Sequence, residues 1–270
     1  DALLLAMMAL DIMPGDEVIT TPFTFISTAE TIALLGAKPV FVDIDEKTFN
    51  IDINQIEAKI THKTKAIVPV SLFGQVADMD EINRLAEKHK LSVIEDAAQS
   101  FGATYKGKKS CNLSSIACTS FFPAKPLGCF GDGGAVFTEN DALAEKIKSL
   151  RVHGQTELYV HNHIGLGARL DNLQAAVLLV KLNSYHEAIN LRQAAAERYN
   201  KMLDGLVATP YVKSHNTSVW AQYSIKIPSR NLIKLKLKEM GIPTAVYYPI
   251  PLHLQKCFDY LGYKKNDFPN

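Results

Sequence analysis

Hydrophobic residues in the first half of the chain follow two alternating spacings. Short β-branched runs such as EVITT and KPVFVDID are each followed by a segment with apolar residues at helical spacing, such as ISTAETIALLGA and DINQIEAKI. The same alternation continues through KAIVPVSLF, DMDEINRLAEKH and LSVIEDAA. It is typical of βαβ units, so we predict an α/β fold with a mainly parallel sheet and helices on both faces.

The second half of the chain is richer in helical spacing. IACTSFF and GAVFTE predict two further strands, DALAEKIKSLRVHG predicts a helix, and residues 169–206 predict long helices with a break near Asn183 and Ser184. From residue 207 the pattern changes: VWAQYSIKI alternates like a strand, NLIKLKLKEMG predicts a helix, and AVYYPIPLHLQ predicts a proline-rich loop. We therefore predict a large domain over residues 1–206 and a small α+β domain over residues 207–270.

At both ends of the chain, the pattern of elements is incomplete. Leu3, Leu4, Met7 and Met8 have helical spacing and should be buried, yet no segment precedes them, and YKKNDFPN ends without a closing element. We expect from this pattern that the chain is a fragment of a longer protein, with both predicted domains truncated.

Composition narrows the class of protein. The 270 residues are 47% hydrophobic and 21% charged, and 29 Lys+Arg against 28 Asp+Glu give a net charge of +1. Without a basic run or a long apolar stretch, the sequence predicts neither a nucleic-acid partner nor a membrane partner. Four cysteines without paired spacing predict reduced thiols, and no signal peptide is visible, so we expect a cytoplasmic protein.

One lysine has unusual neighbours. Lys125 lies between Pro123 and Pro126 in SFFPAKPLGCFGDGG, whereas most lysines lie on solvated helix faces. A lysine that is desolvated in an apolar pocket has a lowered pKa and becomes nucleophilic as the free amine. Asp96 follows the predicted strand LSVIE, and ligands of open α/β sheets bind beyond the carboxyl ends of the strands. We therefore expect the Asp96 carboxylate to face the lysine loop.

The lysine and the aspartate together indicate a cofactor. Pyridoxal 5'-phosphate (PLP) needs an amine that forms a Schiff base with its aldehyde and a carboxylate that pairs with its protonated pyridine nitrogen. Ser120, five residues before Lys125, offers a hydroxyl to the phosphate. Phe23 and Phe25 of TPFTFIST offer flat apolar neighbours for the ring. The sequence therefore predicts a PLP site.

The same phrases resemble a known family. SFFPAKPLGCFGDGGAVFT, VIEDAAQSFGATYKGKK, TPFTFISTAETIALLGAKPVFVDID, RLDNLQAAVLLVKL and YYPIPLHLQ are similar to the DegT/DnrJ/EryC1/StrS family of PLP-dependent sugar aminotransferases. The resemblance covers essentially the whole chain. It implies the fold-type I PLP-dependent aminotransferase architecture and a homodimer whose active sites lie at the subunit interface.

The resemblance also implies roles for particular residues. Lys125 becomes the Schiff-base lysine and general acid/base, and Asp96 becomes the partner of the pyridine nitrogen. Gln99 would hydrogen-bond near the phenolic oxygen of the ring, and Ser120 would bind the phosphate. From the residues alone, Asp96 can also cap a helix, and Gln99 can bond its own backbone in a first helical turn.

Two further positions follow from the resemblance. Phe25 corresponds to the residue that stacks on the cofactor ring, and Arg169 falls in the segment that reaches the cofactor of the neighbouring subunit. Relatives often carry an asparagine where this chain has Gly167, so the partner-chain residue that completes the phosphate site stays open.

Other motifs have plainer explanations. The glycines after Lys125 precede a predicted strand rather than a helix, so they do not fit a dinucleotide-binding loop. His161 and His163 have no third ligand patterned nearby, so we predict no metal site. Cys129 lies in a tight glycine loop, whereas a desulfurase needs a mobile cysteine.

The resemblance implies a transamination from glutamate to a nucleotide-linked ketosugar. FFPAKPLGCFGDGG, VWAQYSI and PTAVYYPIPLHLQ are most similar to enzymes that aminate C3 of a UDP-2-acetamido-3-keto-hexuronic acid for O-antigen synthesis. Enzymes for dTDP-3-keto and UDP-4-keto sugars share much of this phrasing and stay open as alternatives. A non-catalytic nucleotide-sugar-binding or regulatory protein on the same fold should lack Lys125 or Asp96, and both are present.

Overall fold

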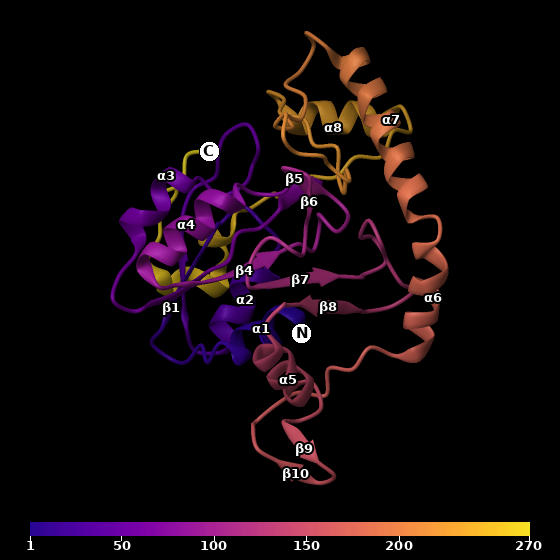
Figure 1. Cartoon of the computed structure of the whole chain (residues 1–270). Coiled ribbons are helices and arrows are strands. Elements are labelled where there is room, and N and C mark those ends of the chain that lie inside the picture. Colours follow the sequence, from indigo (N-terminus) through magenta and orange to yellow (C-terminus); the bar gives the residue numbers. More distant parts are fainter.

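A six-stranded sheet forms the centre of the computed structural model, which describes residues 1–270 (Figure 1). Its order is β2-β1-β3-β4-β7-β8, and every pair of neighbours is parallel except β7 and β8. The predicted mainly parallel sheet is therefore confirmed. The strands are β1 (Glu17–Thr20), β2 (Lys38–Phe41), β3 (Thr64–Ile67), β4 (Ser92–Asp96), β7 (Ile116–Ser120) and β8 (Gly134–Phe137).

Helices cover both faces of this sheet because its strands carry apolar side chains on both sides. Val18 and Ile94 belong to the core beneath α1, α2 and α5, whereas Ile19 and Val93 belong to the core beneath α3 and α4. The alternation of consecutive residues between two cores is the period of a strand. The helices are α1 (Ala2–Ala9), α2 (Ser27–Leu34), α3 (Ile53–Ile56), α4 (Met79–His89) and α5 (Asp141–Leu150).

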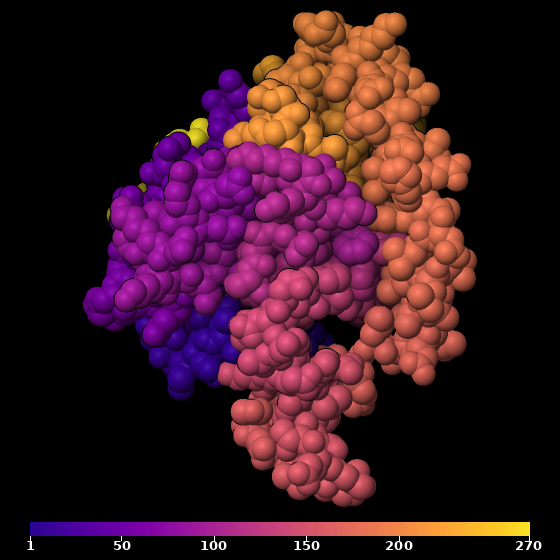
Figure 2. All heavy atoms as spheres, in the orientation of Figure 1, coloured from indigo at the N-terminus to yellow at the C-terminus, as the bar shows by residue number.

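Two long helices form a column along one side of this core (Figure 1). They are α6 (Asn172–Leu182) and α7 (Tyr185–Leu203), and the predicted break between them is confirmed at Asn183 and Ser184. The hairpin of β9 (Gln155–Glu157) and β10 (Val160–His161) lies below α5 in Figure 1, and its residues project from the lower end of the molecule (Figure 1 and Figure 2). A second small hairpin joins β5 (Thr104–Tyr105) to β6 (Lys108–Lys109).

The strand predicted in VWAQYSIKI is absent, and that prediction is wrong. Val219 and Trp220 are both buried although they are consecutive, because Trp220 has a left-handed φ of 50°. The segment instead follows the loop after β3: Val219 N donates to Gly74 O at 3.1 Å, and Ala221 N donates to Phe73 O at 3.0 Å. A Cβ at Gly74 would lie 2.6 Å from Trp220 N, so only glycine permits this approach.

The chain after residue 206 separates into two parts (Figure 1). The predicted helix is confirmed as α8 (Arg230–Glu239), which lies beside the upper end of α7. Residues 252–270 return to the sheet, where Leu252 and Phe258 pack with Ala29 and Phe41. The division of the chain at residue 206 stays a prediction. No helix combines the length and the apolar composition that crossing a membrane requires.

Candidate active site

The carboxylate of Asp96 lies at the carboxyl end of β4 and is buried. Its Oδ2 accepts a hydrogen bond from Thr28 Oγ1 at 2.7 Å, and its Oδ1 accepts one from Ala98 N at 3.2 Å. Burial raises the pKa of Asp96, and the bonds from Thr28 and Ala98 and the charge of Lys125 oppose that rise. Each carboxylate oxygen has two acceptor sites, so Asp96 can accept a further donor.

Lys125 lies in the loop that joins β7 to β8. The loop closes on itself, since Phe121 N donates to Gly133 O at 2.7 Å and Cys129 N donates to Phe121 O at 2.8 Å. A Cβ at Gly128 would lie 2.7 Å from the carbonyl oxygen of Pro123, so the tight return requires glycine there. The sequence therefore holds the backbone that carries the lysine in one conformation.

The ammonium of Lys125 is partly withdrawn from water. Burial lowers the pKa of Lys125, and the charge of Asp96 opposes that change. No ion pair joins Lys125 to Asp96, although each charge shifts the pKa of the other. The Lys125 amine thus remains available to an electrophilic carbon of a ligand, and the Asp96 carboxylate remains available to a basic nitrogen of the same ligand.

Gln99 is fixed by two contacts rather than by its own backbone. Its Oε1 accepts from Phe73 N at 2.8 Å, and its Nε2 donates to the Tyr248 hydroxyl at 3.3 Å. Burial raises the pKa of Tyr248 to about 12, so this phenol remains protonated at neutral pH. The alternative in which Gln99 only bonds its own helical turn does not hold, and the side chain is part of the buried site.

Ser120 lies on the same edge of the sheet as Asp96. Asp96 pairs with Cys118 in the β4–β7 register, so Ser120 lies two residues further along β7. Its hydroxyl accepts a hydrogen bond from Phe122 N at 3.2 Å and is only half-buried, so its proton is free for another acceptor. The structure thus brings Asp96 and Ser120 to the edge from which the Lys125 loop departs.

Phe25 and Arg169 stand apart from this cluster. Phe25 lies two residues before α2 and is 53% exposed, whereas Phe23 packs among aromatic rings. Arg169 is exposed just before α6 and forms no ion pair within the chain. Their predicted roles, like those of the four residues above, stay predictions.

Two residues of the site were missed from the sequence. Thr28 is 68 positions from Asp96, and Tyr248 is 149 positions from Gln99. TPFTFIST and AVYYPIP contained both residues, but neither phrase carries a local sign that a hydroxyl faces the strand ends. Their contacts arise only from the tertiary fold.

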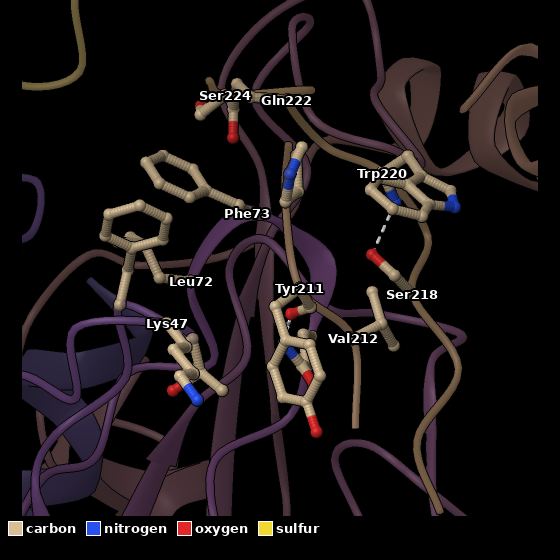
Figure 3. A pocket seen from close by; sticks show the side chains of 13 residues that line it. Lys47, Leu72, Phe73, Tyr211, Val212, Ser218, Trp220, Gln222 and Ser224 are labelled. Carbon is tan, nitrogen blue, oxygen red and sulfur yellow. Dashed lines mark hydrogen bonds between the residues drawn. The ribbon is translucent and has the colours of Figure 1, made fainter. Parts of the chain in front are cut away.

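An aromatic cluster adjoins Gln99. It is formed by Phe23, Phe49, Phe73, Tyr247 and Tyr248. Phe49 and Phe73 also line a pocket whose opposite wall comes from residues 210–224, where Ser218 Oγ accepts from Trp220 N (Figure 3). Gln222 lines the same pocket, and its Oε1 is buried without a hydrogen-bond partner. An unpaired amide oxygen thus lies in a pocket of mixed polar and apolar lining, close to the Phe73 backbone that binds Gln99.

These residues fit PLP. The buried Asp96 has acceptor capacity for a protonated pyridine nitrogen, and Lys125 has an amine whose pKa is lowered by burial. Gln99 and Ser120 add an amide and a hydroxyl at the same edge of the sheet. No group of three His, Cys, Asp or Glu side chains is placed to bind a metal ion. The site is therefore suited to covalent and acid–base chemistry on an organic cofactor.

Comparison with known proteins supports the same conclusion. The sequence model of the DegT/DnrJ/EryC1/StrS aminotransferase family matches residues 1–270. UDP-2-acetamido-2-deoxy-3-oxo-D-glucuronate aminotransferase of Pseudomonas aeruginosa is 57% identical over 256 residues, which cover 94% of this chain and 71% of that protein. A pleiotropic regulatory protein of Geobacillus stearothermophilus is 50% identical over 273 residues, which cover 100% of this chain and 73% of that protein.

Solved structures have the same fold. DesV of S. venezuelae superposes with a TM-score of 0.97 at 39% identity, covering 100% of this chain and 73% of that chain. Spr1654 of Streptococcus pneumoniae, solved in its PLP form, superposes with a TM-score of 0.93 at 28% identity and covers 99% of this chain and 76% of that chain. The fold-type I architecture and the PLP cofactor predicted from the sequence are confirmed.

Proposed function

The chain belongs to the DegT/DnrJ/EryC1/StrS aminotransferase family of PLP-dependent enzymes, and on that premise we propose that it transfers an amino group from glutamate to C3 of a UDP-2-acetamido-3-keto-hexuronic acid. The observation that carries the proposal is the 57% identity to the P. aeruginosa 3-oxo-glucuronate enzyme over 94% of the chain. A lysine at position 125, where some members of the family have histidine and act as dehydratases, supports transamination.

The cofactor would be held by residues at the carboxyl edge of the sheet. PLP supplies an aldehyde that exchanges with the amino group of the donor and a ring that takes up electrons from the substrate carbon. Asp96 would bind the pyridine nitrogen through a charge-assisted hydrogen bond, and Thr28 would hold the carboxylate in place. Gln99, Ser120 and Phe25 would contact the phenolic oxygen, the phosphate and the ring face, respectively.

Lys125 would act twice in each half-reaction. Its amine would attach the cofactor covalently, and after exchange with the incoming amine it would be free to act as a base. With its pKa lowered by burial, the Nζ atom would accept a proton from the substrate carbon and deliver it to the cofactor carbon that carried the aldehyde, on the other side of the transferred nitrogen. The backbone hydrogen bonds that close the loop would limit the movement of this amine at the edge of the sheet.

The choice of sugar rests on the relatives. The 3-oxo-glucuronate enzyme supports a UDP sugar with a 3-keto group and a carboxylate, and O-antigen or another surface polysaccharide would be the destination of the product. The alternatives are a dTDP-3-keto sugar and a UDP-4-keto sugar. The pocket in Figure 3 is lined by Phe49, Phe73 and Trp220 together with polar side chains, and it does not distinguish these sugars.

A homodimer in the cytoplasm is part of the proposal. The β9–β10 hairpin, the segment after it and α6 expose large apolar side chains: Leu158 is 76% exposed, Tyr159 85%, Ile164 90% and Leu173 80%. Such side chains indicate a surface that another protein chain covers. Arg169 lies between the hairpin and α6 and would reach the cofactor of the second copy.

A non-catalytic regulator on this fold is the alternative from another class. It is favoured by the 50% identity to the pleiotropic regulatory protein of G. stearothermophilus. Lys125 and Asp96 are both present, with the pKa of the lysine lowered by burial, so this alternative has no structural support at the site. A desulfurase is disfavoured because the Cys129 thiol is buried and donates to Phe121 O and Gly131 O, both at 3.0 Å.

The decisive experiment is borohydride reduction of the protein after incubation with PLP, followed by peptide mass mapping. We expect the pyridoxyl mass on the peptide that contains Lys125, its loss in Lys125→Ala, and its retention in Lys148→Ala, which changes an exposed lysine. Folded protein without the adduct would contradict the assignment of Lys125. A labelled protein that transfers no nitrogen from glutamate to any of the three keto-sugars would favour the regulator.

A further inference from the structure

A second buried carboxyl group lies directly behind Asp96. Glu95 precedes it on β4, and because consecutive strand residues point to opposite faces, its side chain extends away from the cofactor site. The side chain is fully buried; its Oε1 accepts from Ser110 Oγ at 2.7 Å, and its Oε2 accepts from Cys111 N at 3.0 Å. Glu95 therefore ties β4 to the loop after β6.

The contacts of Glu95 continue to the turn that carries Gln99. Ser110 Oγ lies 2.7 Å from Ser100 Oγ, and Ser100 N donates to Ala97 O at 3.1 Å. A hydroxyl has a single proton, so when Ser110 donates to an ionised Glu95, Ser100 must donate to Ser110. The orientation of the Ser100 hydroxyl, at the end of the 97–100 turn, thus depends on the charge of Glu95.

The titratable groups coupled to Glu95 are acids. Asp96 adjoins it on β4, the Cys118 thiol lies on neighbouring β7, and the Cys111 thiol lies on the loop that binds it. Burial raises the pKa of both thiols, so they stay neutral. Burial also raises the pKa of Glu95 to about 7; the bonds from Ser110 and Cys111 oppose this rise, and the charge of Asp96 adds to it. Glu95 therefore changes its protonation state in the neutral range of pH rather than near pH 4.

We propose that Glu95 is a positioning residue that holds Asp96 and Gln99 from behind the strand and releases its proton when a cationic pyridine nitrogen pairs with Asp96. The inference rests on the proposed function, because it assigns Asp96 to that nitrogen. A cation on Asp96 cancels the negative charge that favours the protonated form of Glu95. The proton leaves the Glu95 carboxyl group for the solvent, and no electrons move.

The coupling between the proton of Glu95 and cofactor binding also predicts how cofactor affinity depends on pH. If loading the site drives a proton from Glu95, raising the pH through neutrality must strengthen binding by the same free energy. A glutamine at position 95 keeps the size and an acceptor oxygen but cannot ionise. It removes the coupling without opening a cavity.

The test measures the protons released on PLP binding, by calorimetry in buffers of different ionisation enthalpy, for wild type and Glu95→Gln. We expect wild type to release up to about half a proton per chain more than the variant at pH 7. The difference should vanish near pH 5 and pH 9. A role that is only structural would not produce this pH-dependent difference.

Two further variants sharpen the test. Ser110→Ala removes a bond that lowers the pKa of Glu95, so the maximal release should move to higher pH. Glu17→Gln is the matched control, since Glu17 is a buried strand glutamate at the opposite end of the sheet, and its release should equal that of wild type.

Equal proton release by wild type and Glu95→Gln, or a maximum that stays in place in Ser110→Ala, would overturn the proposal. If Glu95→Gln does not fold, Ser110→Ala decides alone. A protein that gains the Lys125 adduct with borohydride but shows no coupling disproves only the role of Glu95. A protein that takes up no PLP overturns this inference together with the proposed function.

Discussion

The carboxyl edge of the sheet buries polar side chains, whereas the α6–α7 column exposes apolar ones. At the edge, Asp96, Gln99 and Glu95 are buried and hydrogen-bonded within one chain. On the column, Leu173 and Leu191 are 80% and 66% exposed. At the edge, one chain supplies the buried groups of the site, with Lys125 as the cation beside them. On the column, apolar side chains are left uncovered within the chain. The exposed side chains of the column are the basis of the proposed homodimer, whereas the buried groups of the edge need no second chain to reach their places.

Removing the charge of Asp96 should have the largest effect on the activity of the site. In Asp96→Asn the pyridine nitrogen loses its charged partner, so we expect transamination to fall roughly a thousandfold. The cofactor-free protein should become more stable, because a carboxyl whose pKa is raised stabilises the fold only at low pH and loses that contribution as the pH rises. Thermal melting at pH 7 and single-turnover rates measure both effects, and a parallel loss of stability would contradict this account.

Mixing two inactive variants tests whether the column brings Arg169 to the partner's site. Lys125→Ala and Arg169→Ala should each be inactive. In an equimolar mixture that exchanges subunits, half of the dimers have one intact site, so activity should recover to about a quarter of wild type.

Activity assays of the mixture over time, with each variant alone as control, provide the measurement. If activity does not recover although native mass spectrometry detects mixed dimers, Arg169 acts within its own chain or not at all.

Removing the hydroxyl that holds Asp96 should have a smaller effect. Thr28→Val keeps the shape of the side chain and deletes one hydrogen bond to a buried carboxylate, which is worth about 1.5–3 kcal/mol. The bond lowers the pKa of Asp96, so its loss raises that pKa, and PLP affinity should fall about tenfold or more, most steeply at low pH. Titrating PLP absorbance at pH 6 and pH 8 measures this. Equal losses at both pH values would mean that Thr28 acts through packing alone.

The smallest effect is expected for the contact between the site and the C-terminal segment. Tyr248→Phe removes the acceptor of Gln99 Nε2, while Gln99 Oε1 keeps its bond from Phe73 N. A single neutral hydrogen bond contributes about 1 kcal/mol, so PLP affinity should weaken about fivefold. Gln99→Ala should weaken binding further; if Tyr248→Phe had the larger effect, Tyr248 would contact the ligand directly.

The sequence predicted the parts of the molecule that local pattern controls. The β4 strand and its Asp96 follow from a short apolar run with an acid at its end, and the Lys125 loop follows from its prolines and glycines. VWAQYSIKI looked like a strand because its pattern could not reveal the left-handed φ of Trp220 or the close approach of Gly74. Thr28 and Tyr248 were missed because their partners lie 68 and 149 positions away.

The return of residues 252–270 to the sheet has a consequence for solubility. β2 is an edge strand, and the N–H of Phe41 on its outer side donates to the Tyr263 hydroxyl at 3.2 Å. Leu252 and Phe258 cover the apolar surface beside it. An uncovered edge strand is a template for pairing with another molecule, so this segment protects the enzyme from edge-to-edge aggregation.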